Sequence, residues 1–174
     1  QKCTRCRGRN RHSIFGRTGE SRFTLTIHSL AYPMPSINEI QDQIIEEFSA
    51  FDDWMDRYQL LIDMGSALPE LDAADKVPEN IIEGCQSRVW IAASLQDGKV
   101  HYRADSDALI VKGIVALLLR ILNDQKPKDI VSSDLYFIRE VGLQDHLSPT
   151  RSNGLVSMLK QMRFYALAFE GGEA

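Results

Sequence analysis

The chain is poor in cysteine, and this scarcity excludes several classes of protein. Only three cysteines occur in 174 residues, and two of them, Cys3 and Cys6, lie near the N-terminus. So few thiols cannot make the disulfide framework of a small secreted protein. An iron–sulfur cluster typically takes four ligands, whereas Cys85 is the only cysteine after residue 35. We therefore expect no metal site, and we expect a reducing compartment, by default the cytoplasm.

Long apolar runs are also missing. The longest nearly unbroken one, residues 109–122, is interrupted by Lys112 and Arg120. It is too short and too charged to cross a bilayer, so no membrane partner is expected. No glycine-rich loop suited to phosphates is present, and we expect no cofactor. The hydrophobic content of 44% and charged content of 25% are ordinary for a globular protein.

Acidic side chains are scarce at the N-terminus. Residues 1–35 hold seven Lys or Arg and one Glu, so the rest holds 13 basic and 23 acidic side chains, a net charge of −10. An acidic body repels phosphates, which argues against a nucleic-acid partner. We interpret residues 1–35 as a leader outside the fold: a tag, upstream read-through or a targeting segment. Residues 36–174 are expected to form a single domain.

Helical signals dominate that domain. Ser36 with Glu39 forms a capping box ahead of apolar residues at helical spacing, which predicts a helix to about Ala50. Similar patterns predict helices from Asp53 to Gly65, over residues 108–123, over a short segment after Pro127, and from Pro149 to about Phe169.

One hairpin is predicted among these helices. Alternating residues over 87–95 and 99–104 flank Asp97-Gly98, a strong hairpin turn signal. Residues 135–138 are ambiguous between a third strand and a helix. The layout is α+β, with a small antiparallel sheet of about three strands packed by several helices.

Cys85 is the candidate nucleophile, in the stretch Ile81–Trp90. Gly84 permits a sharp turn, and Gln86 and Ser87 are polar residues typical of a loop tip. Arg88 would favour the thiolate, which is the reactive form. The alternative is a buried structural residue, because free cysteine is among the most buried residue types.

Few histidines or charged residues are candidates to act together with Cys85. His101 lies on the strand face opposite Val100 and Tyr102, so a cysteine hydrolase or transferase using Cys85 and His101 stays open. An exposed strand histidine is the simpler interpretation, and His146 is interpreted as a surface or capping residue. Asp105 and Asp107 are interpreted as helix caps. Arg151 either anchors a carboxylate or the loop, or is solvated.

Several ordered motifs resemble one known family. Gly84-Cys85-Gln86-Ser87 followed by Val89-Trp90 resembles the cysteine loop of the SufE family, sulfur-acceptor proteins of iron–sulfur cluster assembly. The likeness continues, in order, in Asp105-Ser106-Asp107-Ala108, Ile110-Val111-Lys112-Gly113, Pro127–Ile130 and Leu147–Leu155. It covers about residues 37–169. Glu83 departs from the family pattern and alters the charge near the thiol.

The resemblance implies a fold related to the IscU-type scaffold proteins. It also implies that Cys85 takes a persulfide sulfur from a SufS- or CsdA-like cysteine desulfurase, stimulates that enzyme and passes sulfur to a SufBCD-type scaffold. Pyridoxal phosphate then belongs to the desulfurase, and the chain is an accessory carrier rather than an independent enzyme.

The expected site consists of Cys85 and a set of loop-supporting residues. We expect the thiol to lie against apolar neighbours, namely Trp90 and residues of the strand-to-helix junction that begins at Asp105. The donor enzyme would then pull the loop away from these neighbours. A homodimer stays open. The supporting residues are expected to be Gly84, Gln86, Ser87, Trp90, Asp105 and Arg151.

Overall fold

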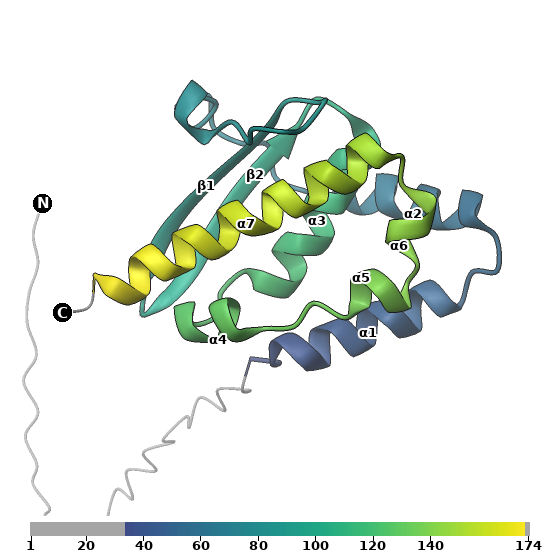
Figure 1. The fold of residues 1–174 in the computed structure, drawn as a ribbon, viewed down its shortest axis with the longest axis horizontal. Coiled ribbons are helices and arrows are strands. Elements are labelled where there is room, and N and C mark those ends of the chain that lie inside the picture. The colour runs from purple at the N-terminus through teal and green to yellow at the C-terminus, as the bar shows by residue number, and fades with distance from the viewer. Residues whose placement is uncertain (1–33, 173–174) are drawn as a thin grey trace, which may run out of the picture. The chain divides into compact units, whose positions relative to one another are not determined.

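A computed structural model describes residues 34–172, in which helices surround a two-stranded antiparallel sheet (Figure 1). The α+β class is confirmed. The expected leader falls, up to residue 33, outside the described residues, as do Cys3 and Cys6. The elements are α1 (Ile37–Ser49), α2 (Trp54–Ser66), the 3₁₀ turn η1 (Pro78–Asn80), β1 (Val89–Gln96), β2 (Lys99–Ser106), α3 (Leu109–Leu122), α4 (Pro127–Ser132), α5 (Phe137–Glu140), α6 (Leu143–His146) and α7 (Pro149–Gly171).

Local signals place the first two helices where the sequence predicts them. The Ser36 amide donates to Glu39 Oε2 at 2.7 Å, and the Glu39 amide donates back to Ser36 Oγ at 3.3 Å. Asp53 caps α2 by accepting the Met55 amide at 2.9 Å. Each cap satisfies an amide that the helix itself leaves free.

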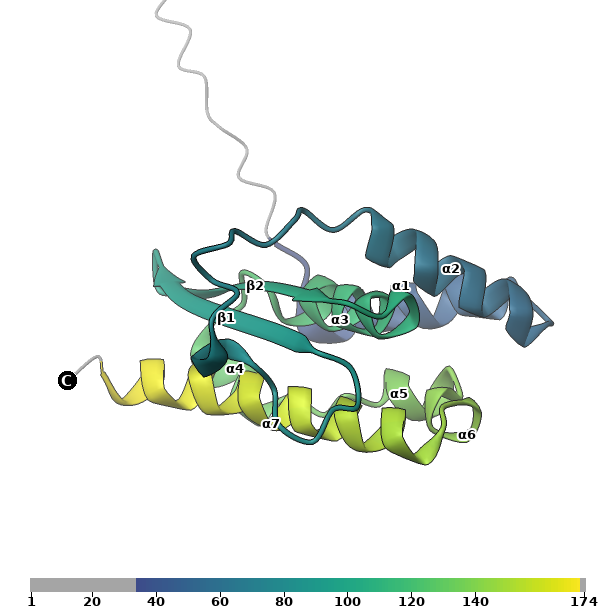
Figure 2. The ribbon, with the colours of Figure 1, turned by 90° about the horizontal axis from the view of Figure 1, so that it is seen from above.

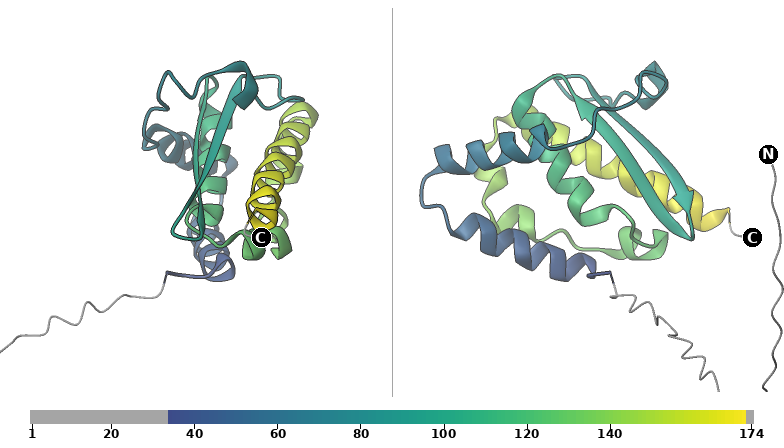
Figure 3. Two further views of the ribbon diagram at one scale, coloured as in Figure 1. Left: turned by 90° about the vertical axis from the view of Figure 1, so that its left-hand side faces the viewer. Right: turned by 180° about the vertical axis from the view of Figure 1, so that it is seen from behind.

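The hairpin turn also forms as predicted. Asp97 and Gly98 have φ angles of 51° and 72°, both in the left-handed region that a two-residue type I′ turn needs. Pairing runs from Gln96↔Lys99 to Val89↔Ser106, so β2 is longer than expected. In Figures 2 and 3, α7 and α2 lie on opposite sides of the layer that the hairpin and α3 form.

The segment left open between a third strand and a helix is helical from Phe137, so the sheet in the described residues has two strands rather than about three. Residues 137–140 form α5, where consecutive Phe137 and Ile138 are both buried, as a strand with one covered face would not allow. The buried Gln41 of α1 fixes this segment: its side chain donates to the Asp134 carbonyl at 3.0 Å and accepts the Phe137 amide at 3.2 Å.

Two glycines let α2 and α3 approach closely. A Cβ added at Gly113 would overlap the Leu61 carbonyl oxygen, and one at Gly65 would lie 2.7 Å from the Gly113 nitrogen. The contact positions α3, and α3 supplies one wall of the cavity described below.

Gly113→Ala is expected to lower the free energy of unfolding by about 1–3 kcal/mol, the usual cost of overpacking. Chemical denaturation measures this loss. Gly171→Ala is the matched control, because a Cβ at Gly171 meets nothing within 4 Å. Equal stabilities of the two variants would contradict the close approach.

Candidate functional site

Cys85 lies in a short loop that is closed at its base. The Ile82 amide donates to the Val89 carbonyl at 2.9 Å, and Ile81 bridges Trp90. Gly84 has a φ of 86°, in the left-handed region, and a Cβ there would lie 2.9 Å from Ser157 Oγ. The turn that Gly84 predicts is therefore present, and its positive φ, together with the crowding by Ser157, disfavours any residue with a side chain.

The thiol of Cys85 faces α7 across a small cavity. Its Sγ lies 3.7 Å from the Gly154 carbonyl oxygen, and a Cβ added at Gly154 would lie 3.1 Å from Sγ. Glycine at this position thus gives the sulfur its space. The cavity of about 70 Å³ is bounded by the loop, α3 and α7, and its lining consists of Cys85, Gln86, Ser87, Val111, Ile114, Thr150, Arg151, Gly154 and Met158.

Burial raises the pKa of the Cys85 thiol above its ordinary value. Removal from water disfavours the charged thiolate. The sequence predicts that Arg88 favours the thiolate, but the Arg88 side chain is exposed and the pKa shift runs the other way. In this loop position the thiol is protonated at neutral pH and a poor nucleophile.

Asp107 ties the end of the loop to the start of α3. The Arg88 amide donates to Asp107 Oδ1 at 3.0 Å, and the Asp107 amide donates to the Arg88 carbonyl at 3.2 Å. Ser106 Oγ donates to the same carbonyl at 3.0 Å. The capping role predicted for Asp107 is wrong, since the N-cap of α3 is Ala108 and has no side-chain cap.

Asp105 is the centre of a neighbouring ion cluster. Its carboxylate is buried and lies 2.7 Å from Lys76 Nζ and 2.8 Å from Lys112 Nζ. Burial alone would raise the pKa of Asp105, but hydrogen bonds from Lys112, Lys76 and the Ser106 amide outweigh it and hold the pKa below its usual value. The ionised carboxylate therefore joins the segment after α2 to α3, and its predicted role as a helix cap is also wrong.

The expected packing of Cys85 is only partly present, because Val111 of the strand-to-helix junction after Asp105 lines its cavity, whereas Trp90 and Asp105 do not. The apolar walls of the cavity are Val111, Ile114 and Met158. Trp90 instead lies under Lys76, whose Nζ is 5.9 Å from the ring centre. The reason is the alternation of the strand: Trp90 pairs with Asp105 on the sheet face opposite the buried Val89 and Ile91.

The remaining residues predicted to support the loop lie in the wall of the Cys85 cavity. Gln86, Ser87 and Arg151 all contribute to its wall. Arg151 is exposed, and its side chain makes no hydrogen bond or ion pair within residues 34–172. Their loop-supporting role stays a prediction.

Neither histidine of the described region joins Cys85. His101 Nδ1 lies 3.1 Å from Asp124 Oδ1 and lines a different cavity. Its register opposite Ser94 places it roughly 16 Å along β2 from Ser106, at about 3.3 Å per residue. His146 stacks on Trp54 with ring centroids 3.9 Å apart. Cys85 thus has no histidine base lining its cavity.

Two further features are absent from the part of the chain that the structure describes. No three His, Cys, Asp or Glu side chains gather there as metal ligands would. None of the helices described combines the length and the apolar character needed to cross a membrane.

Sequence reasoning missed Asp107, Gly154 and the apolar walls on α3 and α7 as parts of the site. Gly154 carried one usable signal, since glycine is unfavourable in a helix interior and its presence indicates a close approach. Nothing in the sequence alone identifies Cys85, 69 residues away, as the residue that approaches.

Three comparisons place this chain among known proteins. A family model described as SufE, Fe-S metabolism associated domain, matches residues 42–166. An uncharacterised SufE-like protein of Synechocystis sp. is 42% identical over 132 residues, which cover 76% of this chain and 83% of that protein. One from Rhizobium etli is 41% identical over 127 residues, which cover 70% and 86%.

A solved structure shares the fold. The solution structure of a hypothetical protein from Thermus thermophilus matches with a TM-score of 0.64 at 22% identity. The match covers 76% of this chain and 96% of that one.

Replacing Asp107 should loosen the loop and expose the thiol. Because the tucked position raises the pKa of Cys85, the alkylation rate of the wild type should rise with pH at a midpoint above that of an unburied thiol. In Asp107→Ala, alkylation at neutral pH should be severalfold faster and the midpoint lower. Mass spectrometry of the Cys85 peptide over a pH series measures both.

Glu46→Ala is the control for this variant, since Glu46 is exposed on α1. Identical profiles for Asp107→Ala and the wild type would show that the Arg88–Asp107 contact does not hold the loop.

Proposed function

The chain belongs to the SufE family and so has a role in iron–sulfur metabolism, and we propose that Cys85 is its sulfur-accepting group. In this proposal a cysteine desulfurase of the SufS or CsdA type donates sulfur to Cys85. A scaffold of the SufBCD type then receives it. The observation that carries the proposal is Cys85, the one cysteine of residues 34–172, which lies half-buried on a turn and lines a cavity of about 70 Å³.

The transfer needs one thiolate and no other group of this chain. The Cys85 thiolate attacks the outer sulfur of the donor persulfide, and a new sulfur–sulfur bond forms as the old one breaks. The donor cysteine leaves as a thiolate, so the exchange requires no external oxidant or reductant. Pyridoxal phosphate stays with the desulfurase.

The protonated, half-buried thiol fits a carrier that reacts only with its partner. A persulfide is prone to oxidation, and an enclosed position protects it. The donor enzyme would draw the loop away from α7, which exposes the sulfur to water and lets it ionise. No second cysteine of the described residues can discharge the persulfide as an internal disulfide.

The absence of His101 from the Cys85 cavity also favours this function over a hydrolase that uses Cys85 and His101. Such an enzyme needs a base within hydrogen-bonding reach of its nucleophile. His101 is paired with Asp124 and does not line the Cys85 cavity.

Incubation with a desulfurase, pyridoxal phosphate and cysteine should add the mass of sulfur to Cys85, located by peptide mapping. Cys85→Ser should carry no sulfur at this position and should not stimulate the desulfurase, because the attacking thiolate is gone. His101→Ala should behave like the wild type. Stimulation of the desulfurase by Cys85→Ser would contradict the carrier mechanism. Loss of sulfur transfer in His101→Ala would instead favour an enzyme that uses Cys85 together with His101.

A further inference from the structure

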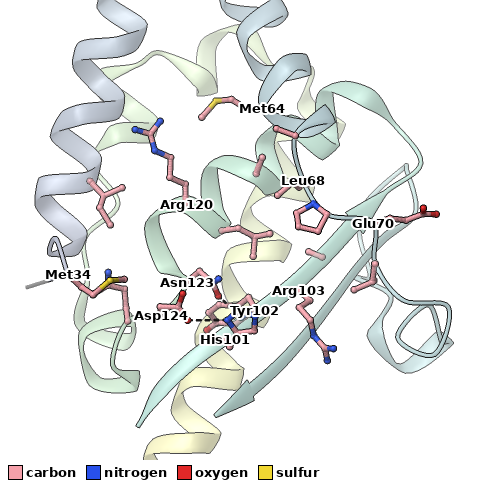
Figure 4. A pocket seen from close by; sticks show the side chains of 18 of the residues that line it. Met34, Met64, Leu68, Glu70, His101, Tyr102, Arg103, Arg120, Asn123 and Asp124 are labelled. Carbon is pink, nitrogen blue, oxygen red and sulfur yellow. Dashed lines mark hydrogen bonds and ion pairs between the residues drawn. The ribbon is translucent and has the colours of Figure 1, made fainter. Parts of the chain in front are cut away.

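A second and larger cavity lies away from Cys85. It is a cleft of about 840 Å³ that shares no lining residue with the thiol cavity. Figure 4 shows it bounded by the ends of α1 and α2, the segment after α2, β2 and α3. Apolar side chains such as Met64, Leu68 and Leu119 line much of it.

Part of the β2 backbone that lines this cleft makes no hydrogen bond within residues 34–172. The amides of Val100 and Tyr102 point away from β1, since they donate to the Gln125 carbonyl at 2.9 Å and to Asn123 Oδ1 at 2.6 Å. By the alternation of an antiparallel ladder, the N–H and C=O of Ala104 point the same way. They have no partner within residues 34–172, and neither has the Tyr102 carbonyl.

Such groups indicate what kind of ligand the cleft accepts. Ala104 is only 4% exposed, and a buried backbone amide without a partner is rare in folded proteins. Ala104 presents both a donor, its N–H, and an acceptor, its C=O. The backbone of a second extended chain can pair with both, because it offers a C=O and an N–H at the matching positions. A fatty acid or an aromatic molecule would leave at least one of them unpaired.

The charged side chains at the rim of the cleft determine which charge a ligand should carry. The two arginines of the cleft are neutralised, Arg120 by Glu47 at 2.6 Å and Arg103 by Asp75 at 3.0 Å. Glu70 is exposed and has only a 3.9 Å contact with Lys76, and Asp72 forms no ion pair in the described region. The uncompensated charge is negative.

We propose that this cleft binds an extended peptide segment of a partner protein, with alternating apolar side chains and basic residues at its ends. The peptide backbone bonds to Ala104 and to the Tyr102 carbonyl, its apolar side chains enter the cleft, and its basic residues face Glu70 and Asp72. Because the thiol cavity is separate, one partner can hold the carrier here while Cys85 stays free to exchange sulfur.

A labelled heptapeptide, Lys-Val-Thr-Val-Thr-Val-Lys, is titrated with the full chain and its fluorescence anisotropy is followed. The double variant Glu70→Lys, Asp72→Lys should bind about tenfold more weakly, the loss of two exposed ion pairs. The control double variant Glu46→Lys, Glu79→Lys makes the same charge change on exposed residues outside the cleft and should bind nearly as the wild type. Ala67→Trp, at an exposed position on the rim, should block binding by filling the cleft.

Peptides N-methylated at alternate amides test the backbone contact. Methylation of the amides that face β2 should abolish binding, because those amides donate to the β2 backbone. Methylation of the amides that point away from β2 should leave binding unchanged. The proposal would be overturned if the two sets of methylated peptides bound equally, or if the peptide did not bind at all. An equal loss of affinity in the control double variant Glu46→Lys, Glu79→Lys would also overturn it. So would a dimer seen by sedimentation that Ala67→Trp dissociates, because the occupant would then be a second copy.

Discussion

The contact between the Cys85 sulfur and helix α7 at Gly154 determines the chemical state of this protein's one described thiol. It requires α7 to have no side chain at Gly154 and the loop to turn at Gly84, where φ is positive. It also requires α3 to supply Val111 and Ile114, and α3 is positioned by its close approach to α2. Burial then raises the pKa of the thiol and so further disfavours the thiolate.

In the proposed function, this arrangement would make the reactivity of Cys85 depend on a partner. A self-sufficient cysteine enzyme activates its nucleophile with a base, whereas here His101 belongs to a different cavity. Only a few hydrogen bonds hold the loop, among them those between Arg88 and Asp107. A docked enzyme could replace them at modest cost, and release of the loop would expose the sulfur and lower its pKa together.

The parts of the structure that depend on neighbouring residues could be predicted from the sequence. The capping box at Ser36, the turn at Asp97-Gly98 and the loop turn at Gly84 are all local signals with a stereochemical cause. The parts that were left open or were wrong depend on distant residues. Residues 137–140 are helical because Gln41 of α1 holds them. Asp105 pairs with Lys76 and Lys112 rather than capping a helix, and Cys85 meets Gly154 rather than Trp90. The spacing of residues along the chain does not predict such long-range contacts.

The central claim is that Cys85 is a shielded thiol that only its partner makes reactive. The most direct test compares the rate at which Cys85 gains sulfur from a desulfurase-bound persulfide with the rate from a small-molecule persulfide, at equal donor concentration. The account predicts that the desulfurase reacts orders of magnitude faster, while the small persulfide reacts as slowly as an alkylating reagent. Equal rates from the two donors would contradict it.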